Sequence, residues 1–291
     1  MNSAKLNATG AINATKNAIG AALGSSSSSI MVFLVITVVV IVCIIGYIVY
    51  KVRRADLQSV DLVKNPRKLF GSGGSPLVID GNKMPATLNG QEFAFSFWMY
   101  LLDSSPTADH KVVFYRGGSS SLTTTSVIGS SPVVSMDKSS NRLRVSVRTG
   151  NAVTPASSTA SYSITNILAD PGYLTASIDY LPLQRWVHVV AVVQDNLLTL
   201  YEDGDIYTVE NVSDLQGSPV FSGISGQLTV GGGANEVRGY VNKLQYYNYA
   251  LSPRDVRQLY ENGPTSNSVL NLLGVDNYGM RTPIYKTDGS G

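Results

Sequence analysis

Residues 185–205 read RWVHVVAVVQDNLLTLYEDGD, and this stretch decides the fold. Two apolar runs, Arg185–Val193 and Leu197–Glu202, flank a short polar segment, and Asp203 with Gly204 supplies the turn that follows. Apolar runs of this length separated by short polar turns are typical of antiparallel hairpins. The stretch therefore predicts an all-β architecture built from consecutive hairpins.

A second stretch, Glu92–Tyr100, reads EFAFSFWMY and predicts a strand with large apolar groups on both faces. Such a strand belongs inside a packing of two sheets, not at a solvated surface. Period-two alternation predicts further strands at 111–116, 141–148, 227–230 and 239–247. One helix is expected after Ser252, which is a suitable N-cap before Pro253, and it should end near Asn262.

The apolar run Ile30–Tyr50, IMVFLVITVVVIVCIIGYIVY, contains no charged residue. As a helix it would cross a hydrocarbon core of about 30 Å. Tyr47 and Tyr50 lie at one end, where aromatic rings favour the headgroup region. The basic residues that follow at once are Lys51, Arg53 and Arg54. We predict a single transmembrane helix; a buried core helix or a cleaved signal peptide explains the run less well.

Charge near this run predicts its orientation. Residues 51–70 hold six basic side chains against two acidic ones, and the positive-inside rule places such a collar in the cytosol. The N-terminus would then be lumenal or outside, and the large C-terminal part cytosolic. The sole cysteine, Cys43, lies within the apolar run, so the folded part carries no disulfide. Because the basic excess is confined to the collar, no nucleic-acid partner is expected.

These observations divide the chain into five parts. The expected order is a small, polar tail (1–29), the transmembrane helix (30–50), a basic stalk with a Gly/Ser linker (51–76), a β-sandwich (77–263) and a C-terminal tail (264–291).

Three blocks of the chain resemble a known family. FAFSFWMY at Phe93–Tyr100, the hairpin at 185–205 and GYVNKLQYYNYALSPRDVRQLY at Gly239–Tyr260 are similar to the laminin-G-like branch of the concanavalin A-like lectin/glucanase fold. The resemblance implies a two-sheet antiparallel jelly-roll sandwich. The residues that carry the family motif are Trp98, Trp186, His188, Asp203, Gly204, Asn242 and Ser252.

Enzymatic function is not expected. Hydrolases of this fold supply their carboxylates as Glu-x-Asp-x-x-Glu on one strand, and the sequence lacks that pattern. The chain has two histidines, His110 and His188, and no cysteine outside the apolar run. Nucleophile–base pairs and zinc sites are therefore disfavoured. We expect no catalytic residue and no cofactor, and a structural role for His188.

Metal and sugar binding are also weakly supported. Where the family commonly shows Asp-Glu, this chain has Asn242 and Lys243, which puts a calcium site in doubt. Tyrosines could form a contact surface for protein or glycan; the candidates are Tyr240, Tyr246, Tyr247 and Tyr249. Alternation sends Tyr246 and Tyr247 to opposite faces.

The sequence as a whole predicts a non-enzymatic, membrane-anchored module that links a lipid bilayer to a neighbouring protein layer. This topology suits a minor structural protein of a large DNA virus, in which the capsid assembles on an internal virion membrane. A cell-surface lectin or adhesion protein in the opposite orientation is the main alternative, with glycan as its ligand. A divergent glycosidase is the third.

Overall fold

The computed structural model describes residues 35–47, 58–71, 76–88, 91–117, 129–150, 164–217, 219–232 and 236–264. The chain divides into two compact units, residues 1–56 and 57–291. The positions of Ile30, Tyr50, Lys51, Arg53 and Arg54, and the predicted tails apart from Pro264, lie outside the described residues.

In the N-terminal unit, residues 35–47 are helical. The apolar side chains of this helix are exposed, with Val42 at 62% and Tyr47 at 61%. Among the described residues, no helix combines the length and apolar character needed to cross a membrane.

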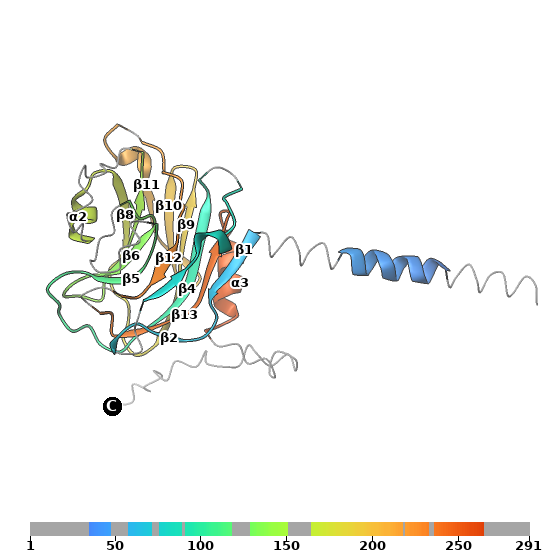
Figure 1. The fold of residues 1–291 in the computed structure, drawn as a ribbon, viewed down its shortest axis with the longest axis horizontal. Coiled ribbons are helices and arrows are strands. Elements are labelled where there is room, and N and C mark those ends of the chain that lie inside the picture. The colour runs from blue at the N-terminus through green and yellow to red at the C-terminus, as the bar shows by residue number, and fades with distance from the viewer. Residues whose placement is uncertain are drawn as a thin grey trace, which may run out of the picture. The chain divides into compact units, whose positions relative to one another are not determined.

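The second unit contains two antiparallel sheets that face each other (Figure 1). The seven-stranded sheet has the order β1-β13-β4-β9-β10-β11, with β2 also paired to β13. Its strands are β1 (Ser59–Val63), β2 (Arg67–Lys68), β4 (Phe93–Leu101), β9 (Trp186–Gln194), β10 (Leu197–Glu202), β11 (Asp205–Asn211) and β13 (Gly239–Tyr247). The six-stranded sheet has the order β3-β12-β5-β6-β7-β8. Its strands are β3 (Leu77–Ile79), β5 (Lys111–Arg116), β6 (Val133–Met136), β7 (Leu143–Arg148), β8 (Tyr173–Ile178) and β12 (Leu228–Val230).

The core lies between the sheets and is rich in aromatic rings. Phe95 and Phe97 of β4 pack on Phe114 of β5, with ring centroids 5.5 and 5.2 Å apart. Phe95 also contacts Tyr246 of β13 at 5.1 Å. All four rings have no exposed area. Aromatic pairs at these separations add to the free energy of area burial. The inward face of β4 is therefore held both to β5 of the opposite sheet and to β13 of its own sheet.

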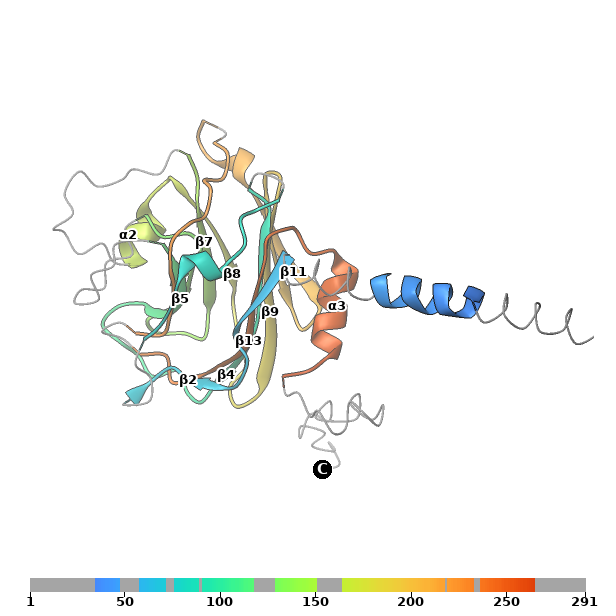
Figure 2. The same cartoon turned by 45° about the vertical axis from the view of Figure 1, so that its right-hand side comes forward.

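Among the described residues of this unit, two α-helices and two short 3-10 helices accompany the sheets. They are α2 (Ile164–Ala169), α3 (Pro253–Glu261), η2 (Gly81–Lys83) and η3 (Val212–Asp214). Ser252 caps α3: its hydroxyl accepts the Asp255 N–H, and the Asp255 carboxylate accepts the Ser252 N–H, which forms a capping box. Figure 2 shows α3 on the side of the seven-stranded sheet that faces away from the other sheet.

The predicted antiparallel sandwich is confirmed, and each predicted strand is present with ends shifted by no more than two residues. The stalk predicted for residues 51–76 is wrong where the structure describes it. β1 pairs with β13 from Ser59↔Tyr247 to Val63↔Leu244, and β2 pairs with its other end. Val63 and Leu69 are 6% and 1% exposed in the main core. The stalk is predicted because this segment is highly charged, and no pattern in the sequence indicates that Val63 and Leu69 are buried.

We expect Leu69→Ala to destabilise the domain by about 2–5 kcal/mol, because it leaves a cavity in a packed core. A flexible stalk would show no change at this position. The measurement is thermal unfolding of the full chain, with Leu88→Ala as the matched control, since Leu88 is 54% exposed. Equal melting temperatures for the two variants would contradict the placement of Leu69 in the core.

Candidate functional site

The face of the seven-stranded sheet that points away from the core carries four of the family-motif residues, Trp98, Trp186, His188 and Asn242. On β4, Ser96, Trp98 and Tyr100 alternate with the buried phenylalanines and point to this outer face. Strand pairing builds cross-strand rows from them: Asn242–Trp98–His188 in one row and Tyr240–Tyr100–Trp186 in the next. The two rows are therefore adjacent along the strands.

Helix α3 covers the outer face only in part. Its inward side packs on a small cluster that includes Ala94, Val190, Tyr247 and Val256. At its end, Tyr260 stacks on Trp98 with centroids 5.8 Å apart and planes at 18°. The row with Trp98 is thus covered, whereas the row with Tyr100 is left without this lid.

A small cavity opens next to the covered row, where β13 is irregular. The register shifts between Asn242 and Gln245, and Lys243 adopts φ of 44°. A bulge of this kind bends a strand and redirects its side chains. The resulting cavity of about 240 Å³ is lined by Asp61, Val63, Lys64, Ser96, Trp98, His188, Lys243, Gln245, Leu259 and Asn262.

His188 is the most buried titratable group in this cavity, with 1% exposure. Its Nε2 lies 2.9 Å from the Ser96 hydroxyl oxygen, and its ring lies 4.9 Å from that of Trp98. Its Nδ1 has no hydrogen-bond partner among the described residues. Burial, with a smaller contribution from the Lys243 charge, lowers the pKa of His188 to about 3. The imidazole is therefore neutral at physiological pH.

The Ser96–His188 pair lacks what a nucleophile–base pair requires. A catalytic histidine needs a pKa near the working pH and an acidic group that orients its second nitrogen. The nearest motif carboxylate, Asp203, instead accepts the main-chain N–H of His188 at 2.9 Å and the Arg185 guanidinium at 3.0 Å. The arrangement gives a rigid, neutral site that donates and accepts hydrogen bonds.

Asp203 and Gly204 form the tight turn between β10 and β11. Both have positive φ, 50° and 90°, which a two-residue hairpin of this kind requires. Burial raises the pKa of Asp203, and the His188 N–H and Arg185 partly oppose the rise. The Asp203 carboxylate therefore fixes the main chain at His188, whose side chain lines the cavity.

Asn242 and Lys243 hold the end of α3. Asn242 is 2% exposed, and its amide donates to the Pro264 carbonyl. The Lys243 ammonium donates to the Gly263 carbonyl at 2.7 Å and to the Asn262 carbonyl at 3.3 Å. A cation at a helix C-terminus is favourable. Within the described ranges, no group of three or more His, Cys, Asp or Glu side chains could hold a metal ion.

The uncovered row extends into a run of four aromatic side chains, Phe70, Tyr240, Tyr100 and Trp186, which we call the aromatic strip. Successive ring centroids are 6.1, 6.4 and 5.4 Å apart. All four residues are partly exposed. The strip offers a continuous surface on which another molecule can stack.

Two cations lie at the Phe70 end of the strip. The Lys68 ammonium lies 4.3 Å from the Phe70 ring centroid, and the Arg238 guanidinium carbon lies 5.9 Å from it. Arg238 also pairs with Asp103 at 3.1 Å. Aromatic and arginine side chains together are the composition that is enriched at protein interfaces.

The predicted tyrosine surface differs from the observed one. Tyr240 belongs to the aromatic strip, but Tyr246 is fully buried in the core and Tyr247 is 8% exposed beneath α3. Tyr249 packs on Tyr247 at 5.8 Å and is partly buried. Tyr246 and Tyr247 do point to opposite faces, yet both faces are covered there.

Sequence reasoning missed two members of the strip. The outward alternation of Glu92–Tyr100 could have indicated Tyr100, but Phe70 follows a charged segment that carries no local signal of strand pairing. The two tryptophans also differ from each other: Trp98 is 5% exposed, whereas Trp186 is only partly buried.

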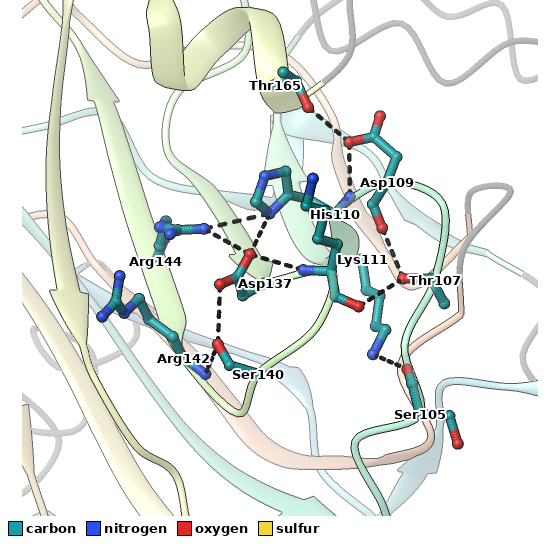
Figure 3. A network of polar contacts seen from close by, with 11 residues as sticks. Ser105, Thr107, Asp109, His110, Lys111, Asp137, Ser140, Arg142, Arg144 and Thr165 are labelled. Atoms are coloured by element: carbon teal, nitrogen blue, oxygen red, sulfur yellow. Dashed lines mark hydrogen bonds and ion pairs between the residues drawn. The ribbon is translucent and has the colours of Figure 1, made fainter.

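The second histidine, His110, belongs to a polar network on the six-stranded sheet (Figure 3). His110 Nδ1 and Arg144 Nη1 lie 3.3 and 3.2 Å from the same Asp137 carboxylate oxygen. Asp109 accepts the Thr165 hydroxyl of α2 at 2.7 Å. Burial, and next the Arg144 charge, lowers the pKa of His110. The hydroxyls of Ser140 and Thr165 donate to the carboxylates of Asp137 and Asp109 and not to His110. These bonds connect α2 and the loop at Ser140 to the six-stranded sheet, so we interpret the network as structural.

A wider hollow of about 800 Å³ lies between α3 and the β10–β11 hairpin. This hollow is open to solvent, and two of its lining residues, Arg257 and Asp205, form an ion pair of 2.7 Å. Of the family-motif residues, only Gly204 lines this hollow. The smaller cavity at His188 and the aromatic strip therefore form the candidate site.

Comparison with known proteins gives one family. A sequence model of the concanavalin A-like lectin/glucanases superfamily matches residues 80–257. None of the curated proteins matches the chain.

Several solved structures are similar to the chain. The receptor-binding domain of botulinum neurotoxin mosaic serotype C/D is 14% identical, with a TM-score of 0.48 over 71% of this chain and 45% of that one. The receptor-binding domain of botulinum neurotoxin D is 13% identical, with a TM-score of 0.48 over 69% and 45%. The binding domain of botulinum neurotoxin DC in complex with rat synaptotagmin II is 11% identical, with a TM-score of 0.43 over 70% and 45%. The chain spans less than half the length of each.

The neutral, buried His188 predicts a pH dependence of stability. Its pKa of about 3 in the folded state lies below its unfolded value, so the unfolded state gains a proton first as pH falls. The contribution of neutral His188 to the free energy of unfolding is complete above about pH 6.5. As pH falls from there toward the folded pKa, this contribution decreases by up to about 1.4 kcal/mol per pH unit.

The measurement is thermal or urea unfolding between pH 7.5 and 4.5. We expect His188→Gln, which keeps a partner for Ser96, to flatten the dependence relative to the parent protein. His110→Gln is the comparison, and it should flatten the curve less because His110 is less deeply buried than His188. An unchanged slope in His188→Gln would contradict the assignment.

Proposed function

The chain belongs to the concanavalin A-like lectin/glucanases superfamily over residues 80–257, and on this basis we propose that it is a non-enzymatic binding module whose contact surface is the aromatic strip. The observation that carries the proposal is the half-covered outer face: α3 shields the row of Trp98 and leaves Tyr100, Trp186 and Tyr240 accessible. Large rings that are rigid and partly exposed dominate binding energy at protein contacts.

The carboxylates near the motif support binding over hydrolysis. Glycoside hydrolysis needs two carboxyl groups about 5–10 Å apart that both face the substrate. At the β10–β11 turn, Asp203 is engaged by His188 and Arg185, and Asp205 pairs with Arg257 at 2.7 Å. The Glu202 carboxylate makes no hydrogen bond or ion pair among the described residues, but it lies within the electrostatic influence of Arg185. The turn therefore offers at most one carboxylate that is free to act on a substrate, whereas hydrolysis needs two.

We propose further that the module is anchored in a membrane. The support is the uncharged apolar run Ile30–Tyr50, whose described part, residues 35–47, is helical with exposed apolar side chains. Exposed apolar area of this extent favours a lipid surround. The basic residues Lys51, Arg53 and Arg54 favour a cytosolic position for the sandwich.

In this proposal the partner is a protein layer next to the membrane. The capsid of a virion with an internal membrane is one such layer, and a membrane-facing structural protein would meet it with the aromatic strip. Lys68 and Arg238 at the end of the strip suit a protein surface with acidic or main-chain acceptors. Glycan binding is the second candidate, because the same rings could stack on sugars.

The test of the contact surface uses Tyr100→Ala and Trp186→Ala in the intact protein, purified in mild detergent. Both side chains are partly exposed, so we expect native melting temperatures but at least a roughly tenfold loss of the co-purifying protein partner. Tyr180→Ala is the matched control, since Tyr180 is an aromatic residue with 63% exposure outside the strip. Partner recovery that is equal in all three variants would argue against the strip. Strip-dependent binding on a glycan panel would favour the lectin alternative.

Topology is tested separately in sealed membrane vesicles. We expect added protease to digest the sandwich and to leave the N-terminal segment protected, because the basic collar orients the chain. Asn211 begins the sequence Asn-Val-Ser in the sandwich. Native glycosylation at Asn211 would place the sandwich on the other side of the membrane and overturn the predicted orientation.

A further inference from the structure

A further pocket lies away from the aromatic strip, at the end of β5. Arg116, the last residue of that strand, is only 4% exposed. Its guanidinium carbon lies 4.9 Å from the ring centroid of Tyr246, which belongs to the core. A guanidinium stays charged in proteins, so the structure buries a positive charge against an aromatic ring.

This charge is not neutralised within the described part of the chain, where Arg116 takes part in no ion pair. Its Nε donates a long hydrogen bond of 3.4 Å to the Gly226 carbonyl, and its Nη1 has no hydrogen-bond partner among the residues that the structure describes. A buried charge without a counter-ion or full hydrogen bonding is unfavourable. The guanidinium therefore has unused capacity to bind a negative group.

The same arginine lines an open pocket of about 730 Å³. The rest of the lining comes from two segments, Asp80–Asn82 with Met84 and Ala86 on one side and Ile224–Gln227 on the other. The segments approach closely: a Cβ on Gly81 would lie only 2.5 Å from the Gly226 carbonyl oxygen. Only glycine fits there, so the backbone geometry beside Arg116 is fixed.

We propose that this pocket binds an oxyanion group of a ligand through Arg116. Carboxylate and other oxyanions match the planar donors of a guanidinium, and the resulting hydrogen bonds are charge-assisted. The guanidinium that lines the pocket would donate to this group. This site is independent of the aromatic strip, because none of its lining residues belongs to the strip.

One acidic side chain opposes the ligand. Asp80 lines the pocket, and its Oδ1 accepts the Asn82 N–H at 3.0 Å. Its carboxylate is not within ion-pair distance of Arg116. Repulsion from this charge should weaken the binding of any anion and should weaken dianions most. The pocket is thus expected to favour a singly charged group, such as a carboxylate, over sulfate or phosphate.

The experiment measures the melting temperature of the full chain in mild detergent against acetate, sulfate and phosphate, at constant ionic strength kept with sodium chloride. A ligand that binds only the folded state raises stability in a saturable way. We expect a saturable rise in the parent protein and none in Arg116→Met, which keeps the length of the side chain without its charge. Arg254→Met is the matched control, because Arg254 is an exposed arginine outside this pocket, and it should keep the rise.

Asp80→Asn makes the test independent of whether Arg116→Met folds. It keeps Arg116 and removes the repelling charge, so the anion concentration at half-saturation should fall several-fold, most for sulfate and phosphate. A rise that is equal in Arg116→Met and the parent protein would be a general salt effect and would overturn the proposal. No saturable rise with any of the three anions, or no change in Asp80→Asn, would overturn it as well.

Discussion

The structure depends on the two-sided burial of strand β4. Phe95 and Phe97 on one face require the second sheet, and Ala94, Ser96 and Trp98 on the other face require a lid. Helix α3 supplies that lid, and its capping box starts it at the place where Val256 and Tyr260 reach the sheet. Because α3 is only nine residues long, it cannot cover the full length of β4. The aromatic strip is the part of the outer face that the helix does not reach.

The inner architecture could be predicted from sequence because it follows from local alternation. The strands at Phe93–Leu101 and Trp186–Gln194 repeat apolar residues with period two, and the turn at Asp203 and Gly204 has its own backbone signature. The edge strands could not be predicted in the same way. β1 is only five residues long and β2 consists of two basic residues, and their pairing with β13 spans most of the chain. Such long-range pairing leaves no local pattern.

The candidate site, too, could be predicted from the sequence only in part. The motif predicts that His188 lies on an apolar strand, but its neutral state results from the three-dimensional environment: Trp98 and Tyr260 stack beside it, and Lys243 adds a like charge. The aromatic strip joins residues from three strands and from the segment after β2. Adjacency of Phe70 and Tyr240 is a property of the sheet order, so no spacing in the sequence encodes it. The pocket at Arg116 likewise brings together three segments that are distant in sequence.

The edge position of β1 has a mechanical consequence. Tension applied to the chain before Ser59 reaches the folded unit first through the hydrogen bonds between β1 and β13. Next in line are the β2 pairing and the bond from the Leu69 N–H to the Gly239 carbonyl. Only then would force reach β4, which is secured on both edges by β13 and β9. The unit is therefore built to yield in steps: β1 and β2 would separate from β13 first, with loss of the core contacts of Val63 and Leu69, before the pairing of β4 is broken.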